Sequence, residues 1–442
     1  MKKKLNPILA LLFLIVIVAV MIRATNNRLD YMSEGASANY GFETSQIAAS
    51  VAAGHGFGNP YPLVQTGPTA LMPPVYIYLL AGIFKVFGAQ SDSSYLVATT
   101  LSALFSTLVC IPIFFLGKRV AGNTLGLVAA ALWAVFPFAV TASTGRFAVW
   151  DTTLSALLAT LALLATLRLC DSDRAGAWIG YGALCALALE VNPAILSVLP
   201  FLFAWLAWKL HERRGAWLRL PALAGILIVL GCAPWSARNW VEFHHFIPFR
   251  SNFGLELWLG NNQYEDHDQF PDRRSPYSNG LEAQRYAKIG EVAFMREKKT
   301  QAVEFIDAHP SQTLRSDYIR FAVLWTGLAA RVQDVWPLLP GSVRFLLVLN
   351  ALFVILGWLG LLAMFRQRNP LAWPFSFFIA IYPAVYYVTH ATLRYRYPID
   401  PTLAVLSTFA VYCAVRATVR PFARASAGSA TASEPQPSLA SQ

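Results

Sequence analysis

Charged residues are scarce in this chain of 442 residues: Lys, Arg, Asp and Glu make up 13% of it, whereas hydrophobic residues make up 56%. An average soluble domain has about 25% charged residues. The composition therefore excludes an ordinary soluble protein and indicates a polytopic membrane protein. The formal net charge of +11 is read by location along the chain, and with no nucleic-acid-binding motif it does not indicate nucleic acid as a partner.

Cysteine and histidine are also few. None of the five cysteines has CxxC spacing, and all fall in or at the ends of apolar runs, which argues against a disulfide framework or a cysteine-built metal site. The seven histidines form no zinc-binding pattern either. The sequence therefore requires no metal and no other cofactor; a divalent metal ion is compatible with it but is not indicated.

Apolar runs long enough to cross a membrane are frequent, and they fix the expected topology. The run 71–88 contains Met72-Pro73-Pro74, and leaving it out places every basic cluster on the cytoplasmic side, as the positive-inside rule requires. We therefore expect 71–88 to lie along the outer face of the membrane or to dip in and return. The ten spanning runs lie near residues 5–22, 95–117, 120–140, 151–170, 176–193, 195–210, 217–235, 343–365, 371–389 and 402–417.

This topology predicts an all-α polytopic membrane protein of about 10–12 transmembrane helices, with juxtamembrane helices on its outer face and a mixed extracytoplasmic insert. Within the first outer loop, 37–53 is helix-like. The segment after 424 is rich in Ala, Ser, Thr, Pro and Gln, which is typical of disorder. The predicted parts are an N-terminal transmembrane catalytic module (1–235, with the first outer loop at 23–90), the insert (236–341), C-terminal transmembrane helices (342–420) and a disordered tail (425–442).

The segment Arg394-Tyr395-Arg396-Tyr397-Pro398-Ile399-Asp400-Pro401 stands between two apolar runs, so that it lies at a membrane edge. The fork of donors on arginine matches phosphate oxygens, and the prolines stop the helix. A site for a lipid-linked phosphate needs such groups. The alternative is that Arg and Tyr only anchor helix ends at the interface.

Two carboxylates on the expected outer face are candidate acid–base groups. Glu43 lies on the predicted helix 37–53, where partial desolvation raises a carboxyl pKa and suits it to act as a base; the alternative is an ordinary solvated acid. Asp151 begins a span directly after Trp150 and close to Arg146. It either caps the helix or forms a corner that faces a sugar or a phosphate.

Aromatic and amide side chains gather near the same face. Rings stack on sugar faces while amides bond sugar hydroxyls, so that Arg238, Trp258 and Asn261 together are typical of a carbohydrate site. Asn192 follows Glu190 at the end of a span, where a polar group is often functional. The alternative is the belt of tryptophans that occurs at every membrane interface.

Several motifs follow one another in a fixed order along the chain. They are Glu-Thr-x-x-Ile-Ala (43–48), Gly-His-Gly-Phe (54–57), Thr-Gly-Pro-Thr-Ala-x-x-Pro-Pro-x-Tyr (66–76), Phe-Gly (87–88), Gly-Arg-x-x-x-Trp-Asp (145–151), Pro-Trp-x-x-Arg-Asn (234–239), Leu-Trp-Leu-Gly-Asn (257–261) and the segment 394–401. Together they resemble the bacterial branch of the GT-C glycosyltransferases, the group of the dolichyl-phosphate-mannose protein mannosyltransferases (glycosyltransferase family 39) and the lipid A aminoarabinose transferase. The resemblance runs from about residue 5 to 420.

The resemblance implies a GT-C-like bundle in the inner (plasma) membrane. It implies an enzyme that transfers a sugar, a hexose or a pentose, from a polyprenyl-phosphate donor to a protein, lipid or glycan on the extracytoplasmic side, with inversion. Glu43 and Asp151 would be catalytic, with Asp30 and Glu34 as rivals of Glu43. The phosphate would be bound by Arg394 and Arg396, with Arg146 or Arg238 as further candidates, and the sugar or acceptor by Tyr40, Trp150, Asn192, Trp258, Asn261 and Tyr395.

Two other classes of function remain open. A transporter or a flippase for lipid-linked glycans would place polar groups near the bilayer midplane and often repeats its halves, whereas here the polar residues gather at the outer face and no repeat is visible. A scaffold protein would tolerate Glu43→Gln and Asp151→Asn. A glycan polymerase or ligase that uses the same face differs mainly in its donor.

Overall fold

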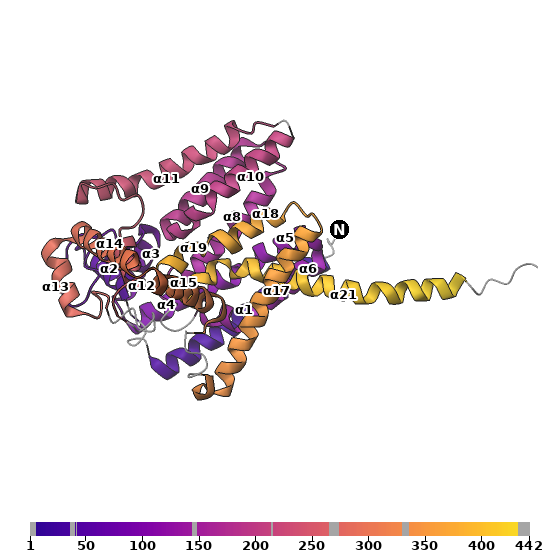
Figure 1. Ribbon diagram of the computed structural model, residues 1–442, viewed down its shortest axis with the longest axis horizontal. Coiled ribbons are helices and arrows are strands. Elements are labelled where there is room, and N and C mark those ends of the chain that lie inside the picture. Colours follow the sequence, from indigo (N-terminus) through magenta and orange to yellow (C-terminus); the bar gives the residue numbers. More distant parts are fainter. Residues whose placement is uncertain are drawn as a thin grey trace, which may run out of the picture.

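The computed structural model describes residues 6–35, 40, 42–143, 148–213, 215–264, 274–328 and 336–431. Within these ranges the chain is helical and contains no strand, apart from one isolated bridge between Gly58 and Pro68. Figure 1 shows helices running along the long axis of the molecule, with α21 (Asp400–Thr431) projecting beyond one end. The prediction of an all-α protein is confirmed. Where the insert is described, it consists of helices and loops.

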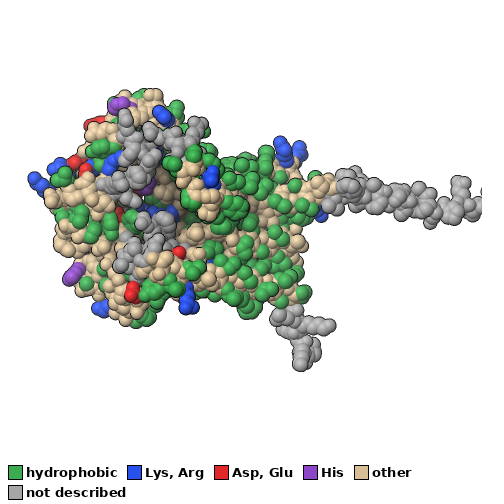
Figure 2. Space-filling model, turned by 90° about the horizontal axis from the view of Figure 1, so that it is seen from below, with side chains coloured by type: hydrophobic (Ala, Val, Ile, Leu, Met, Phe, Trp, Pro, Cys, Tyr) green, Lys and Arg blue, Asp and Glu red, His purple; other side chains and the backbone are tan. Residues whose placement is uncertain are grey.

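In this part of the chain, six helical stretches are long and apolar enough to cross a membrane, and further apolar helices of 10–17 residues accompany them. All ten predicted runs fall on helices. Side chains such as Phe13, Val229 and Phe345 are more than 60% exposed, and Figure 2 shows hydrophobic side chains covering the body beside the charged end. An apolar surface of this size indicates contact with lipid. The six stretches are 7–33, 92–121, 152–169, 219–243, 341–366 and 393–418.

Helix α1 (Pro7–Glu34) continues twelve residues beyond the predicted end at 22. Its continuation depends on Arg23, which is fully buried and donates hydrogen bonds to Ser106 Oγ and to the carbonyl oxygens of Ala134 and Ala139. A buried charge is tolerated when its donors are paired in this way. The apolar pattern stops at the first charged residue, which is why the sequence places the first outer loop too early.

Helices α2 (Phe42–Ala52) and α3 (Pro74–Phe87) pack together at the end of the molecule that also holds α12 (Phe253–Gly260) and α14 (Glu291–Ala308) (Figure 1). Their contact is an apolar cluster that includes Ile47, Leu80 and Phe84. With 14 residues, α3 is about 21 Å long, shorter than the roughly 30 Å hydrocarbon core. That length agrees with the expectation that 71–88 does not cross the membrane.

The predicted insert, from residue 236 on, starts inside α11 (Arg219–Phe243), which continues through Pro234 past residue 235. It contains α12 (Phe253–Gly260), α13 (Gly280–Ile289), α14 (Glu291–Ala308) and α15 (Pro310–Thr326). At the other end of the chain α21 reaches Thr431, so that the segment predicted as a disordered tail starts inside this helix, and residues 432–442 lie outside the described ranges.

The remaining helices complete the bundle. They are α4 (Asp92–Leu108), α5 (Cys110–Ala121), α6 (Asn123–Val135), α7 (Pro137–Thr141), α8 (Thr152–Leu169), α9 (Ala175–Val191), α10 (Leu199–Glu212), α17 (Gly341–Arg366), α18 (Ala372–Ser376), α19 (Ala384–Val388), α20 (Leu393–Arg396) and short turns at Pro193–Ser197, Trp336–Leu338, Phe377–Ile381 and Tyr397–Ile399.

Candidate active site

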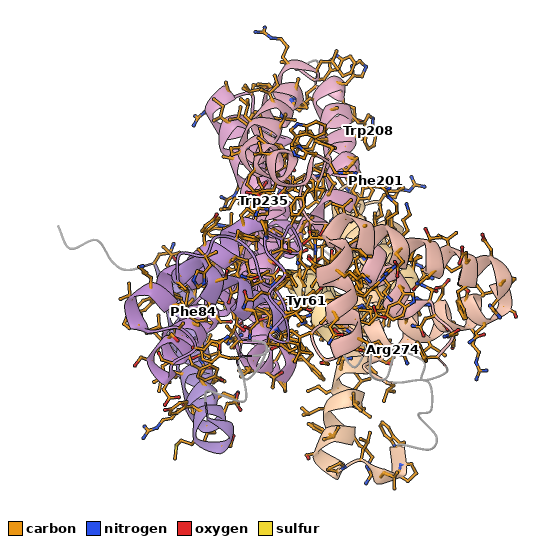
Figure 3. All side chains as sticks on the ribbon, turned by 90° about the vertical axis from the view of Figure 1, so that its left-hand side faces the viewer. Tyr61, Phe84, Phe201, Trp208, Trp235 and Arg274 are labelled. Atoms are coloured by element: carbon orange, nitrogen blue, oxygen red, sulfur yellow. The ribbon has the colours of Figure 1, made fainter. Side chains whose placement is uncertain are left out.

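A cavity of about 490 Å³ lies where the predicted outer segments meet. Figure 3 views the molecule from this end and shows Tyr61 between the N-terminal helices and the helices of the insert. The ring of Tyr61 packs edge-on against Tyr286 of α13, with 5.0 Å between centroids. The cavity is lined by residues of α2, the segment 71–77, residues 150–152, residues 191–194, α12 with the turn before it, Ser275 and Tyr277, and the segment 385–398.

Three carboxylates line this cavity, and two of them, Glu43 and Asp151, are the ones that the sequence selected. Glu43 comes from the first turn of α2, and Asp151 directly precedes α8. The Asp151 side chain does not cap α8; instead its Oδ2 accepts hydrogen bonds from Asn192 Nδ2 at 2.9 Å and from Ser155 Oγ at 3.0 Å. Because Asn192 orients this carboxylate from another segment, capping does not explain Asp151.

The charge of Glu43 is felt across the rim of the cavity. Burial, followed by the negative charges of Glu43, Glu291 and Glu256, raises the pKa of Tyr61 well above its ordinary value. A phenol in this setting stays protonated and can only act as a neutral hydrogen-bonding group. Tyr61 is therefore not a candidate base.

Arg394 supplies positive charge beside Asp151. Its Cζ lies 3.9 Å from the centroid of the Trp150 ring and 5.0 Å from that of Tyr395. Stacking on the indole fixes the plane of the guanidinium group. Because Trp150 is the neighbour of Asp151 in sequence, the same short segment positions a carboxylate and holds a cation.

A second charged group was not selected from the sequence. Glu256 Oε2 lies 2.9 Å from His390 Nδ1, and Tyr395 OH shares a hydrogen bond of 3.0 Å with His390 Nε2. Asn252 Nδ2 donates to Glu256 Oε1 at 2.6 Å, and Arg250 Nη2 lies 3.9 Å from the same oxygen. The signal was an acidic residue inside the apolar run 253–260, because a charge is rarely kept in such a setting without a partner.

The pKa of Glu256 shows how these charges combine. Burial alone would raise it, but the hydrogen bond and charge of His390, followed by the charges of Arg250 and Arg394, hold the pKa below its ordinary value. Glu256 is therefore a carboxylate that is committed to its cationic neighbours. It is less suited than Glu43 or Asp151 to take a proton from a substrate.

Two glycines of α12 explain how Glu256 comes to lie beside His390. A Cβ on Gly254 would stand 1.9 Å from the carbonyl oxygen of Met295 in α14, and one on Gly260 would stand 1.6 Å from that of Thr389. Only glycine permits backbones to approach so closely. The helix is thereby clamped between α14 and the segment that carries His390.

The rim segment 69–71 is held by two charged residues far away in the sequence. Arg238 donates to the carbonyl oxygens of Thr69 and Phe57 at 2.7 and 3.0 Å. Glu291, the first residue of α14, is buried and accepts hydrogen bonds from the Thr69 hydroxyl, the Ala70 amide and the Tyr286 hydroxyl. Leu71, Met72 and Pro73 can then line the cavity because the backbone before them is fixed.

The structure brings about half of the predicted site residues to the cavity. Besides Glu43, Asp151 and Arg394, the cavity is lined by Trp150, Asn192 and Tyr395. Arg146 lies outside the described residues. The rival Asp30 lies on α1, where it accepts a hydrogen bond from Asn26, and does not line the cavity; the side chain of Glu34 is not among those described.

The other predicted residues have structural partners instead. Arg396 is fully buried and pairs with Asp400, with 2.6 Å between Nε and Oδ1. Arg238 holds the rim, as described above. Tyr40 is buried in the α2–α3 cluster, where its hydroxyl bonds Ser91 O and Ser94 Oγ. Arg396, Arg238 and Tyr40 do not line the cavity, and neither do Trp258 and Asn261.

Trp258 and Asn261 belong to the packing of α12. Lys298 Nζ lies 3.7 Å from the ring centroid of Trp258, and the Asn261 amide donates to the carbonyl oxygens of Leu257 and Val388. An aromatic ring or an amide at a membrane edge serves packing as well as binding, and the sequence alone does not separate the two uses.

The chain is similar to known proteins in its sequence and in its fold. Residues 72–237, less than half of the chain, match the model of a family described as dolichyl-phosphate-mannose-protein mannosyltransferase. The resemblance to the GT-C glycosyltransferases is therefore confirmed. The matched segment contributes Met72, Tyr76, Asp151 and Asn192 to the cavity. None of the curated proteins matches the chain.

Solved structures share the fold. The chain is similar to the oligosaccharyltransferase AglB from Archaeoglobus fulgidus in complex with an inhibitory peptide and a dolichol-phosphate (TM-score 0.55, 13% identity, 98% of this chain and 52% of that chain). It is also similar to the Archaeoglobus fulgidus oligosaccharyltransferase tethered with an acceptor peptide (TM-score 0.55, 14% identity, 93% and 50%). ArnT from Cupriavidus metallidurans bound to undecaprenyl phosphate is matched at a TM-score of 0.40 (15% identity, 90% and 77%). The chain spans about half the length of the archaeal enzyme.

Proposed function

We propose that this protein transfers a sugar from a polyprenyl-phosphate carrier to an acceptor, and that the reaction takes place in the cavity at the outer end of the bundle. The observation that carries the proposal is that two carboxylates, Glu43 and Asp151, and the guanidinium group of Arg394 line one cavity. A transfer of this kind needs a base for the acceptor hydroxyl and positive charge for the departing phosphate.

The roles follow from the contacts of each group. Asp151, oriented by Asn192, and Glu43 receive or orient the proton of the acceptor hydroxyl. Arg394, which stacks on Trp150, and Arg250, which also lines the cavity, stabilise the charge that grows on the carrier phosphate. A single displacement at the anomeric carbon gives an inverted product. The sugar, hexose or pentose, and the acceptor, a protein, lipid or glycan, are left open by this arrangement.

The match to a mannosyltransferase family and the fold shared with an oligosaccharyltransferase that binds a dolichol-phosphate support a lipid-linked donor. By the positive-inside rule, the cavity faces the extracytoplasmic side of the inner (plasma) membrane. The guanidinium groups supply the counter-charge, so that the proposal requires no metal ion. We therefore expect transfer to survive treatment with EDTA.

The test compares membranes that contain the wild type, Glu43→Gln or Asp151→Asn at equal protein levels. The loss of polyprenyl-phosphate sugars and the release of free polyprenyl phosphate are followed. The wild type should release the carrier, and each substitution should slow release roughly 10²–10⁴-fold, the usual contribution of a general base. Movement of the intact lipid-linked sugar across the membrane without release would overturn the proposal in favour of a flippase, and a product with retained anomeric configuration would exclude the single displacement.

A further inference from the structure

The chain of groups formed by Glu256, His390 and Tyr395 has no part in the reaction described so far, although all three residues line the cavity. The chain is continuous: Glu256 Oε2 lies 2.9 Å from His390 Nδ1, and His390 Nε2 lies 3.0 Å from the Tyr395 hydroxyl. Nε2 shares a hydrogen bond, and Nδ1 lies within ion-pair distance of a carboxylate. His390 itself is 7% exposed, whereas Tyr395, at the end of the chain, is half-buried and lines the cavity.

The protonation of His390 decides what the Tyr395 hydroxyl can do. An imidazole with two protons donates from Nε2 to the phenol oxygen, and the phenolic hydrogen is then directed elsewhere. A neutral imidazole that donates from Nδ1 to Glu256 accepts the phenolic hydrogen at Nε2, and the phenol then offers only lone pairs to a ligand. The first arrangement makes Tyr395 a hydrogen-bond donor, and the second makes it an acceptor.

The surroundings favour the donor arrangement when an anion is bound. The carboxylate of Glu256, from α12, stands at Nδ1, and a neighbouring negative charge favours the imidazolium. Arg250 lies 3.9 Å from Glu256 and offsets part of that charge, and Arg394 lies beside the Tyr395 ring. On the other sides Tyr386 of α19 stacks on Tyr395, with 4.7 Å between centroids, and Arg320 of α15 donates to the carbonyl oxygens of residues 388 and 389.

We propose that Tyr395 is a further group that contacts the carrier phosphate, and that His390 and Glu256 are positioning residues that turn its hydroxyl toward that phosphate. The inference rests on the proposed function. In the reaction the acceptor oxygen forms a bond to the anomeric carbon while the bond between that carbon and the phosphate oxygen breaks. The electron pair of the broken bond passes to the phosphate oxygen, and Tyr395 donates a hydrogen bond to the phosphate without losing its proton. The proton of the acceptor hydroxyl goes to Glu43 or Asp151, as before.

The ligand chemistry that this arrangement recognises is a phosphate monoester, the group that the carrier bears after transfer. Arg394 stacks on Trp150 and lies beside the Tyr395 ring, so that a guanidinium group and a phenol converge on one side of the cavity. An alcohol of the same lipid has no charge and a single hydroxyl oxygen in place of the phosphate oxygens. The carrier phosphate and the corresponding alcohol are therefore a matched pair of probes.

The experiment measures binding of undecaprenyl phosphate and of undecaprenol to the purified full chain in detergent. The wild type should bind the phosphate more tightly than the alcohol. Tyr395→Phe should weaken binding of the phosphate about tenfold or more, the effect of one hydrogen bond to a charged group, and leave the alcohol unchanged. Tyr412→Phe is the matched control, because Tyr412 stacks on Phe409 of α21 and does not line the cavity.

His390→Gln and Glu256→Gln separate positioning from simple structural support. Binding is measured between about pH 5.5 and 8.5, on either side of the ordinary imidazole pKa of about 6.5. The weakening caused by His390→Gln should be largest at low pH and should shrink as the wild-type imidazole loses its second proton. Titration of the phosphate itself is common to both proteins and cancels in their ratio. Glu256→Gln should weaken binding in the same direction.

The outcomes are distinct. A Tyr395→Phe protein that binds the phosphate like the wild type overturns the inference, while the proposed function stands. A weakening by His390→Gln that is equal at every pH, or larger at high pH, also overturns it and favours the neutral arrangement, in which Tyr395 accepts a hydrogen bond. A wild type that binds undecaprenol as tightly as undecaprenyl phosphate contradicts the proposed function itself.

Discussion

The segment 393–400 carries two arginines that point to opposite sides and have different roles. On the cavity side, Arg394 lies over Trp150 and beside Asp151. On the core side, Arg396 is fully buried and bonds Asp400, Asn350 Oδ1 and the carbonyl oxygen of Trp325. Residues two apart on a helix point about 200° away from each other. One arginine can therefore reach a ligand only because the other fixes the turn that carries it.

The largest effect is expected when Arg396 is replaced. Arg396→Ala leaves the buried Asp400 carboxylate without its cation, and we expect the free energy of unfolding to fall by about 3–5 kcal/mol. Thermal unfolding in detergent measures the change. Arg416→Ala is the control: Arg416 is exposed on α21, and a substitution there should shift stability by about 0.5 kcal/mol at most. An Arg396→Ala protein of normal stability that fails to bind the carrier phosphate would place Arg396 in the site instead.

Arg394 should show the reverse behaviour. Arg394→Ala should lower the transfer rate roughly 10²–10³-fold, the usual loss for one group that stabilises developing negative charge, and should leave thermal unfolding nearly unchanged. Arg394→Lys should recover only part of the rate, because a lysine keeps the charge but loses the planar fork that stacks on Trp150. If Arg394→Ala lowered the free energy of unfolding as much as Arg396→Ala does, the two arginines would have the same structural role.

A smaller effect is expected where α12 meets the segment before Arg394. Gly260→Ala places a Cβ 1.6 Å from the carbonyl oxygen of Thr389, and overpacking of this kind costs about 1–3 kcal/mol. The displacement should also weaken binding of the carrier phosphate, since His390 follows Thr389. Gly225→Ala in α11 is the control, because its Cβ meets no atom within 4 Å. If both variants unfold at the same temperature, the close approach at Gly260 is not a constraint on stability.

The smallest expected effect is a pH dependence of stability that comes from Glu256, on the cavity side. The pKa of Glu256 lies below its ordinary value in the folded protein, so its ion pairs contribute stability that is present above the unfolded pKa of about 4.3 and is lost as the pH falls through the folded pKa. The difference in unfolding temperature between the wild type and Glu256→Gln should be larger near pH 5, where an imidazole of ordinary pKa about 6.5 carries both protons, than below about pH 4. A difference that grows on acidification would contradict the sign of the shift.

The sequence predicted the helices well because an apolar run of spanning length is a local property. It failed where a charge is buried by partners far away: Arg23 lies inside α1 because Ser106 and the end of α6 satisfy it. The candidate site shows the same division. Asp151, Trp150 and Arg394 were found because each stands at the edge of an apolar run.

Arg396 and Arg238 were both predicted to bind the phosphate, and they do not line the cavity for two different reasons. The opposite directions of Arg394 and Arg396 follow from helical geometry, which could have been applied to the motif once it was taken as helical. Arg238 could not have been placed in this way, because its partners, Thr69 and Phe57, are more than 160 residues away in sequence. Glu256 and His390 were missed for the same reason, since they are 134 residues apart and only the fold brings them together.

The hydrogen bonds of Glu291 have a consequence for the order in which the protein is made. The Thr69 hydroxyl and the Ala70 amide find their acceptor 222 and 221 residues later in the chain. At about 5–20 residues per second during synthesis, roughly 10–45 s pass before that acceptor exists. Until then the Thr69 hydroxyl and the Ala70 amide have no carboxylate to bond, and the first outer loop of the nascent chain stays accessible to water. Closure of the rim segment is therefore a late event of biogenesis, because it waits for the arrival of α14.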